Sequence, residues 1–213
     1  MDPRPVPPCL DDVRFAVVDI ETTGLESTRH RILQVAVVTV DAAGNTLDEW
    51  SSYARPRFLP LRRLGPRKIH GITKAALRHA PSPAATLREL ARRLDGAVLT
   101  AHNAEFDVGF LLHHSRRLGV AFPERPQVCT LTLSRSLDPQ RSLSHRLFDV
   151  CERYGVPLDR PHDALADAHA TAAVLPHLLR EGGIHTWDQL AAVATPKAPK
   201  EHGERRRTGQ SRR

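Results

Sequence analysis

Two short apolar runs near the beginning of the chain limit the possible folds most strongly. Arg14–Ile20 (RFAVVDI) is mainly apolar and leads into carboxylates, and Ile32–Val40 (ILQVAVVTV) is rich in β-branched residues. Runs of this length and composition are typical of buried strands. The segment Asp41–Asn45 is a turn signal, and Thr46–Tyr53 alternates as a third strand. These segments together predict an antiparallel meander.

The rest of the chain alternates predicted helices with short apolar strands. Strands are predicted at Ala97–Ala101 and Gln127–Thr130. Helices are predicted at Thr73–His79, from a Ser82 cap to about Asp95, from Asn103 or Ala104 to Leu118, from a Ser144 cap to Gly155, and from about Asp163 to Arg180. This order predicts an α/β fold in which three antiparallel strands are followed by parallel strands in one mixed sheet, with helices on both faces.

The length of 213 residues fits one domain with tails. We expect residues 1–12, which hold four prolines, to form a loose leader, and residues 13–195 to form the domain. Residues 196–213 contain seven basic and two acidic residues, so this predicted disordered tail carries +5 of the net charge of +7. The tail either adds salt-sensitive attraction for phosphates or is simply solvated.

Cysteine usage and hydropathy bound the cellular setting. The three cysteines, Cys9, Cys129 and Cys151, form no CxxC pair, which argues against a disulfide framework and a structural zinc site. No apolar run approaches the roughly 20 residues that a membrane span requires, and the N-terminus lacks a signal-peptide pattern. We therefore expect a cytoplasmic protein.

Asp19 and Glu21 are the first candidate site residues. Residues two apart on a strand point to the same face, so both carboxylates project together from a strand end. Like charges at this distance raise each other's pKa, and a divalent cation between them removes the repulsion. A pair of acids facing water is the alternative. The segment Thr22–Gly24 that follows is a turn in which backbone can approach a ligand closely.

A second acidic segment, His102–Asp107 (HNAEFD), lies where a short strand meets a helix. Ligands of α/β sheets gather outside the ends of strands, which suits a site here. Asp107 lies among apolar residues, where an unpaired carboxylate is costly. The alternative is that Glu105 and Asp107 only favour the positive end of the helix dipole.

The third segment is His162–Ala170 (HDALADAHA). Asp163 and Asp167 are four residues apart and share a helix face, with Asp163 as the predicted cap and Asp167 pointing inward. His162 precedes the helix, and a histidine side chain can accept a proton from water at neutral pH. Four acids and one histidine from three segments are the inventory of a two-metal phosphodiesterase, in which cations clamp the phosphate.

Four motifs in order resemble the DEDDh group of 3′–5′ exonucleases: VVDIETTGL (17–25), IHGIT (69–73), AHNAEFDVGFL (101–111) and HDALADAHAT (162–171). The pattern is similar to that of the proofreading epsilon subunits of bacterial replicative DNA polymerases and covers roughly residues 13–180. The resemblance implies a ribonuclease H-like fold and two divalent cations, Mg²⁺ or Mn²⁺. It also implies that Asp19, Glu21, Asp107 and Asp167 bind metal and that His162 is the general base.

The resemblance further implies contacts with the substrate strand. The turn residues are expected to pack on the terminal nucleotide, and residues of the second and third motifs are expected to line the same pocket. The predicted substrate-binding residues are Thr22, Thr23, Gly24, Leu25, His70, Ile72, His102, Asn103 and Phe106. Purely structural roles are the alternative: Asn103 as a helix cap, Ile72 as core, and His70 as a partner for a backbone carbonyl.

The segment Ala54–Lys68 is predicted to be a loop and contains six basic residues and no acids. We hypothesise that it guides the incoming single strand through phosphate contacts. The alternative is a solvated loop in a chain that prefers arginine throughout.

The function that follows is 3′–5′ exonuclease activity, with single-stranded DNA as the expected substrate and DNA repair or turnover as the setting. The basic tail offers no apolar segment for a polymerase or clamp partner, so a stand-alone monomer or homodimer is expected. An exoribonuclease is the first alternative, because the sequence does not show whether the pocket excludes a ribose 2′ hydroxyl. A non-catalytic proofreading or scaffold module is the second.

Overall fold

The computed structural model describes residues 9–56, 64–123 and 127–194. Most of the predicted leader, the whole basic tail, and Arg57, Arg62 and Arg63 of the arginine-rich segment lie outside the described residues. No helix among the described residues is both long and apolar enough to pass through a membrane.

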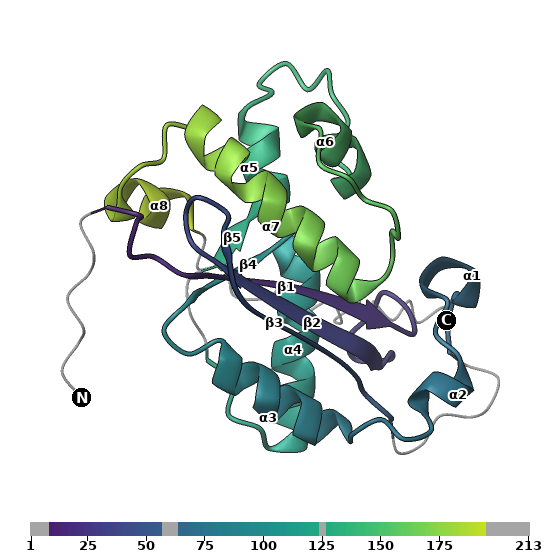
Figure 1. Cartoon of the computed structure of the whole chain (residues 1–213). Coiled ribbons are helices and arrows are strands. Elements are labelled where there is room, and N and C mark those ends of the chain that lie inside the picture. The colour runs from purple at the N-terminus through teal and green to yellow at the C-terminus, as the bar shows by residue number, and fades with distance from the viewer. Residues whose placement is uncertain (1–8, 57–63, 124–126, 195–213) are drawn as a thin grey trace, which may run out of the picture.

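Five strands form a single mixed sheet in the order β3-β2-β1-β4-β5 (Figure 1). The strands are β1 (Phe15–Thr22), β2 (Ile32–Val40), β3 (Thr46–Tyr53), β4 (Val98–Ala101) and β5 (Gln127–Cys129). The first three pair antiparallel, and β4 and β5 run parallel to β1. The predicted fold class is therefore confirmed, and β2 and β3 have the bounds predicted for them.

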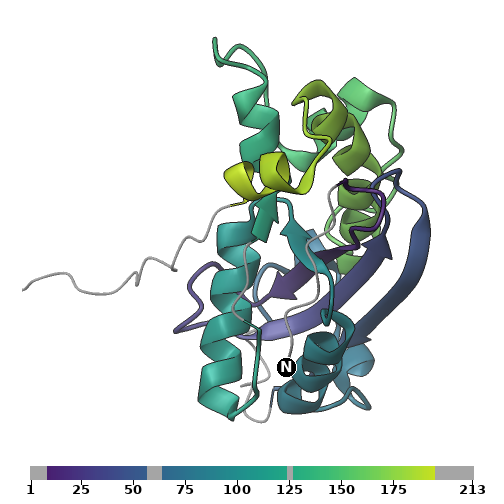
Figure 2. The ribbon, with the colours of Figure 1, turned by 90° about the vertical axis from the view of Figure 1, so that its left-hand side faces the viewer.

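Helices cover both faces of this sheet (Figure 1). They are α1 (Arg67–His70), α2 (Lys74–Leu77), α3 (Pro83–Arg93), α4 (Ala104–Leu118), α5 (Thr130–Ser136), α6 (Leu147–Tyr154), α7 (Ala164–Glu181) and α8 (Trp187–Val193). The helices α7 and α4 lie on opposite sides of the sheet (Figure 2), and α1 and α2 lie at the end of the molecule where β1 ends.

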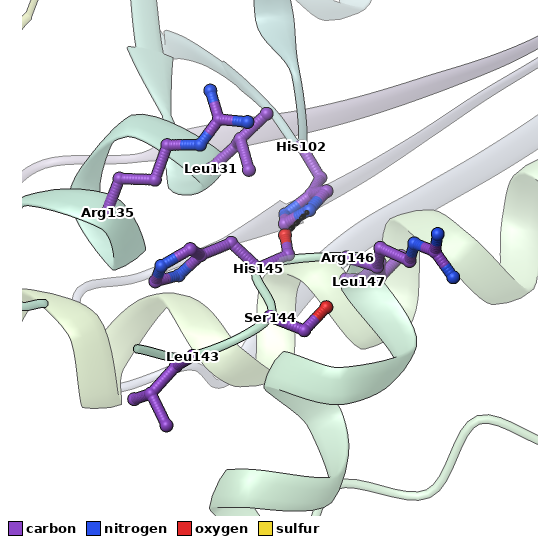
Figure 3. Close-up of a pocket in the computed structure, with 8 residues that line it drawn as sticks. All are labelled: His102, Leu131, Arg135, Leu143, Ser144, His145, Arg146 and Leu147. Carbon is purple, nitrogen blue, oxygen red and sulfur yellow. Dashed lines mark hydrogen bonds between the residues drawn. The ribbon is translucent and has the colours of Figure 1, made fainter. Parts of the chain in front are cut away.

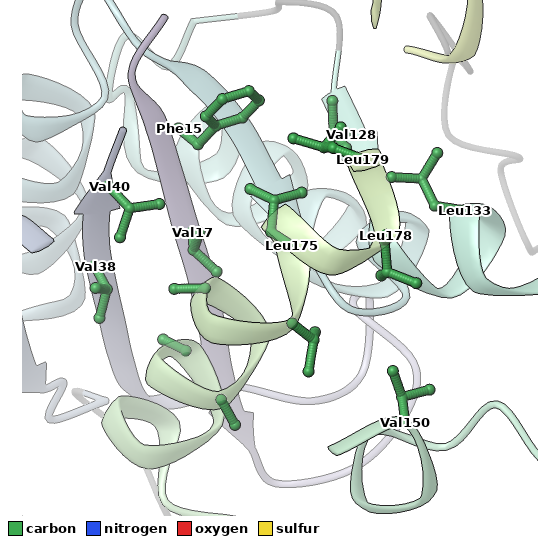
Figure 4. Close-up of a cluster of buried hydrophobic side chains, with 14 of the residues drawn as sticks. Phe15, Val17, Val38, Val40, Val128, Leu133, Val150, Leu175, Leu178 and Leu179 are labelled. Carbon is green, nitrogen blue, oxygen red and sulfur yellow. The ribbon is translucent and has the colours of Figure 1, made fainter. Parts of the chain in front are cut away.

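Strand alternation divides the interior into two cores. Phe15 and Val17 of β1 pack with Leu175 and Leu178 of α7 in one cluster (Figure 4), whereas Val18 belongs to the cluster under α3 and α4. All nine residues of β2 are buried, because both of its faces are covered, and β3 at the sheet edge is largely exposed. The odd-numbered residues of β1 consequently face α7.

Several predicted boundaries differ from the structure. Ser144 does not cap a helix: α6 begins at Leu147, and the Ser144 hydroxyl donates a hydrogen bond to the Asp149 carboxylate. Thr130 starts α5 and does not end β5, and α5 and α8 were not predicted. The segment Ala54–Lys68 was predicted to be a loop, but its last two residues belong to the short helix α1, which continues to His70. At the predicted loose leader, Leu10 is buried and Cys9 forms a β-bridge with Thr186.

Replacement of Leu175 by alanine should destabilise the fold by about 2–5 kcal/mol, because its fully buried side chain leaves a cavity between α7 and the sheet. Leu118→Ala is the matched control: Leu118 also lies on a helix but is 38% exposed, so a loss below about 1 kcal/mol is expected. Denaturant unfolding of both variants measures the difference. Equal losses would contradict the assignment of Leu175 to the core.

Candidate active site

The end of β1 positions two candidate acids on the face of the sheet that α7 covers. Asp19 and Glu21 follow Phe15 and Val17 in strand alternation, and both are partly buried. The pairing of β1 with β2 shifts register between Glu21 and Thr22. Irregularities of this kind redirect side chains at strand ends, so the chain turns away from the sheet directly after the second carboxylate.

The first turn of α7 supplies Asp167. As predicted, Asp163 caps this helix, because its side chain accepts a hydrogen bond from the amide of Ala166. Asp167 is 9% exposed, and its Oδ2 accepts a hydrogen bond of 3.0 Å from the backbone amide of His162. Its Oδ1 is buried and has no hydrogen-bond partner in the described part of the chain. The small residues Ala164 and Ala168 let this end of α7 lie close to the sheet.

Asp107 enters the group from the other side, in the first turns of α4. It is 3% exposed, and its carboxylate accepts hydrogen bonds from backbone amides, including that of Ile20 in β1. This contact ties the start of α4 to the strand that carries Asp19 and Glu21. The residue before α4, Asn103, has a left-handed backbone (φ 70°) and makes no side-chain cap bond. The alternative role of Asn103 as a side-chain cap of this helix is therefore not observed.

The electrostatics of the four acids show how closely they lie. Burial raises the pKa of Glu21 to about 8, and repulsion from Asp167, Asp107 and Asp163 adds to the shift. Burial first, and then repulsion from Asp107, Asp167 and Glu21, raises the pKa of Asp19 well above its usual range. Burial also raises the pKa of Asp107 and Asp167, although backbone hydrogen bonds partly oppose it. Without a cation, this group resists ionisation.

The donor set fits a divalent cation. Glu21, His162 and Asp167 each offer one ligand atom, and these three atoms lie within 4.8 Å of one another. The buried, unpaired Oδ1 of Asp167 is an oxygen that an ion would satisfy. Carboxylate oxygens suit Mg²⁺ or Mn²⁺, and positive charge would relieve the repulsion among the acids.

His162 lies on the loop before α7 with an exposed side chain and a left-handed backbone (φ 67°). Only the hydrogen bond from its amide to Asp167 holds its backbone to this site among the contacts of the described residues. A non-glycine residue adopts this conformation when the surroundings require it, which is common at functional sites. The ring itself remains accessible from solvent.

The loop after β1 contains the four predicted turn residues. The Thr22 hydroxyl donates a 2.6 Å hydrogen bond to the carbonyl of Gly24, and the amide of Thr23 donates to the carbonyl of Arg31. Leu25 is 82% exposed, the largest exposure among the large apolar residues that the structure describes. An apolar side chain held in solvent beside polar catalytic groups suits contact with a base.

Ile72 and His70 have the surroundings expected of the structural alternatives. Ile72 is 3% exposed and packs with Leu33, Leu64 and Leu77, in agreement with a role in the core. Nδ1 of His70 accepts a hydrogen bond from the amide of Ile72, and its Nε2 bonds the carbonyl of Leu64. The His70 ring therefore organises the loop near β1 and offers no free nitrogen.

His102 is also engaged within the protein. Its Nδ1 lies 2.9 Å from the Thr130 hydroxyl and its Nε2 lies 3.0 Å from the carbonyl of His145, and burial lowers its pKa to about 4. This ring borders a pocket of about 430 Å³ that Arg135 and Arg146 flank from two sides (Figure 3). Both ring nitrogens of His102 are thus bonded within the protein, and its place in the substrate pocket stays a prediction.

Asn103 and Phe106 remain accessible where α4 begins. Asn103 is exposed, and Phe106 is partly exposed while its ring packs on Phe110 at a centroid distance of 5.0 Å.

The arginines of the pocket in Figure 3 were not singled out from the sequence. With 27 arginines and four lysines in the chain, no local pattern distinguishes Arg135 or Arg146 from the others.

Comparison with known proteins identifies the family. The family model described as Exonuclease (RNase_T) matches residues 16–175, a range that contains the five candidate catalytic residues and all of the sheet except Phe15. The chain belongs to this exonuclease family. Divalent metal ions are used in the family, in agreement with the donor set of the site.

Curated relatives of this exonuclease include the PolC-type DNA polymerase III of Bacillus subtilis (strain 168). That relative is 34% identical over 187 residues, which cover 85% of this chain and 13% of the relative. The corresponding protein of Lacticaseibacillus paracasei is 34% identical over 185 residues, which cover 85% of this chain and 12% of the relative. This exonuclease thus spans about an eighth of the length of the relatives it matches.

Two solved structures show the same fold. Exonuclease I superposes with a TM-score of 0.70 at 21% identity, over 85% of this chain and 43% of that chain. Exonuclease X, in complex with 5′ overhanging duplex DNA, superposes with a TM-score of 0.62 at 25% identity, over 85% of this chain and 99% of that chain. The similarity to exonuclease X therefore extends over almost the whole of that enzyme.

Divalent cations should stabilise this exonuclease most at high pH. Because the pKa of Glu21 is raised to about 8, the metal-free fold holds a proton that the unfolded chain releases near pH 4. This contribution to stability is complete below about pH 4 and is lost as the pH rises through about 8. Mg²⁺ or Mn²⁺ should therefore raise Tm more at about pH 8.5 than at about pH 5.5, measured against EDTA.

The matched variant is Glu21→Gln, which removes the charge and keeps the size of the side chain. It should flatten the fall of Tm with pH in EDTA and weaken the stabilisation by metal. A metal effect in the wild type that is independent of pH would contradict the electrostatic account, as would an unchanged metal effect in Glu21→Gln.

Proposed function

We propose that this exonuclease removes nucleotides one at a time from the 3′ end of single-stranded DNA and releases nucleoside monophosphates, with two Mg²⁺ or Mn²⁺ ions. One observation carries the proposal most directly: the buried, unpaired Oδ1 of Asp167 belongs to a group in which Glu21 and His162 also offer ligand atoms. A 3′ terminus is the proposed point of attack because the four sequence motifs resemble those of 3′–5′ exonucleases and the chain belongs to the exonuclease family.

In this proposal, Asp19, Glu21, Asp107 and Asp167 hold the metal ions. When bound, the ions would neutralise the charge of the scissile phosphate, activate the attacking water and stabilise the leaving oxygen. The end of β1 and the first turns of α4 and α7 carry these acids, and Asp107 and Asp167 lie near enough to raise the pKa of Asp19 and Glu21.

His162 serves as the general base in the proposal. Its exposed ring lies beside the acids, with a nitrogen within 4.8 Å of ligand atoms of Glu21 and Asp167. An imidazole near neutral pH accepts the proton of the attacking water and passes it to solvent. The hydrogen bond from the His162 backbone amide to Asp167 would keep the backbone of His162 at the site. The side chain of His162 would stay free to turn.

The terminal nucleotide would lie on the loop after β1. Leu25 would pack against its base, and Phe106 at the start of α4 would provide a second apolar surface. Thr22, Thr23 and Gly24 would offer backbone groups near the terminal sugar, and Asn103 a side-chain amide. The arrangement has no requirement for a particular base, since each base presents an apolar face.

DNA is preferred over RNA on the evidence of the relatives. The two curated relatives named above are DNA polymerases, and exonuclease X, of which this chain covers 99%, was solved with DNA. A 3′-exonuclease solved with a histone mRNA stem-loop has the same fold at 17% identity, which speaks for the fold alone. RNA hydrolysis is therefore the alternative outcome of the assay below.

The first assay uses single strands of DNA and RNA of the same sequence, labelled at the 5′ end. Mg²⁺ or Mn²⁺ should give a ladder of shortening products on DNA, and EDTA should abolish it. Asp19→Ala should lower the rate at least about a hundredfold, because it removes a metal ligand worth several kcal/mol. Faster cleavage of RNA than of DNA would show that RNA is the preferred substrate. Full activity in EDTA or in Asp19→Ala would refute the metal-dependent mechanism.

The second assay separates the role of His162 from substrate binding. His162→Ala should lower kcat about 10²–10⁴-fold, as expected for loss of a general base, with little change in the affinity for DNA. His185→Ala is the control, because His185 is also exposed but follows the end of α7 opposite to the one that carries Asp167. Parallel losses of kcat and affinity would show that His162 positions the strand and is not the base.

A further inference from the structure

A basic cluster, composed of Arg31, His113 and Arg117, lies where the loop between β1 and β2 meets α4. The carbonyl of His30 accepts a 2.8 Å hydrogen bond from the Arg31 guanidinium and one of 3.1 Å from Nε2 of His114. The bond from His114 holds the loop against α4, and Figure 2 shows the two side by side. His113 and Arg117 are one helical turn apart and share a face of α4.

Among the residues that the structure describes, no acid forms an ion pair with the arginines of this cluster. Partial burial and repulsion from Arg117 lower the pKa of Arg31, and partial burial with repulsion from both arginines lowers the pKa of His113. Within the described ranges, neither guanidinium forms an ion pair with a carboxylate, whereas Arg29 pairs with Glu26. Like charges gathered in this way favour the binding of an anion.

The cluster is connected to the candidate active site along α4. Phe106 precedes His113 and Arg117 by 7 and 11 residues, which is close to two and three helical turns, so all three share one face. Asp107 and Arg117 are separated by about 15 Å along the helix axis at 1.5 Å per residue. The face thus runs from an aromatic ring beside the acids to the positive charges.

The loop provides a second connection between the cluster and the site. The carbonyl of Arg31 accepts a 2.9 Å hydrogen bond from the amide of Thr23, next to the turn that ends in the exposed Leu25. One loop therefore carries the apolar contact expected for the terminal base at its beginning and a guanidinium of the cluster at its end.

We propose that the basic cluster binds backbone phosphates of the substrate strand, upstream of the nucleotide that is removed. The inference rests on the proposed function for the direction of the strand. Arginine forks match phosphate oxygens with two hydrogen bonds, and a neutral His113 donates one N–H. Binding of phosphate removes the repulsion between Arg31 and Arg117. Such contacts with sugar and phosphate fix the position of a strand without reading its bases.

The test compares a long strand with a very short one. The double variant Arg31→Gln/Arg117→Gln should weaken binding of a thymidine oligonucleotide of about twelve residues by about tenfold at low salt. The slope of log K against log salt should fall by about 1.4, since each phosphate contact on a single strand contributes about 0.7. A dinucleotide, which does not reach about 15 Å from the acids, should bind equally to both proteins. Fluorescence anisotropy in EDTA measures binding without hydrolysis.

Arg180→Gln is the matched control. Arg180 lies one residue before the end of α7, as Arg117 does in α4, and both helices begin at the acids. The single variant Arg117→Gln keeps the hydrogen bond between Arg31 and His30, so any loss of affinity in it does not come from loss of loop structure. A thermal melt of the double variant shows whether its fold is intact. Unchanged affinity and salt slope in the double variant would overturn the proposal, as would a larger effect of Arg146→Gln at the pocket of Figure 3.

Hydrolysis of the p-nitrophenyl ester of thymidine 5′-monophosphate distinguishes this inference from the proposed function. The double variant should hydrolyse this small substrate at the wild-type rate, because only the acids and His162 act on it. A wild-type protein that leaves both the ester and DNA intact contradicts the proposed function, and the anisotropy measurement still tests the cluster. A variant that loses ester hydrolysis shows that the cluster acts on the acids and not on the strand.

Discussion

The burial and mutual repulsion of four carboxylates are the constraint on which the arrangement of this exonuclease depends. Burial raises the pKa of each of Asp19, Glu21, Asp107 and Asp167, and repulsion from neighbouring acids adds to each shift. A fold that only had to be stable would separate these groups or pair them with basic residues. The acids remain together because β1 ends, and α4 and α7 begin, at the same place. Positive charge from bound ions would neutralise their negative charge.

Rigid support of the acids comes from ordinary packing. The core between α7 and β1 fixes Asp167 relative to Asp19 and Glu21, and small alanines allow the close approach of helix and sheet. Backbone hydrogen bonds add the remaining links: an amide of β1 bonds Asp107, and the amide of His162 bonds Asp167. The stability of the apolar layers therefore offsets the unfavourable grouping of charge, which is the usual relation between a scaffold and a preorganised site.

Local patterns predicted the sheet well because each strand carries its own signal. Alternation and β-branched content gave β2 and β3 their bounds, and the cap at Asp163 depends on residues within one turn. What local patterns could not predict depends on tertiary contacts. Ile72 and His102 lie in motifs that also contain accessible residues, and only the folded chain shows that one is core and the other is bonded on both nitrogens. The basic cluster was missed for the same reason, since its members come from distant segments.

The complete burial of β2 has a consequence for how the chain finds its native pairing. A strand with one polar face resists a slip of one residue, because the slip would bury polar side chains. Since β2 is buried on both faces, its hydrophobic pattern does not penalise such a slip. Register must then be specified by the turn that follows, where the Asp41 carboxylate accepts hydrogen bonds of 2.8 and 2.9 Å from the amide and side chain of Asn45. Fidelity of folding is thereby concentrated in a few polar atoms far from the catalytic end of the sheet.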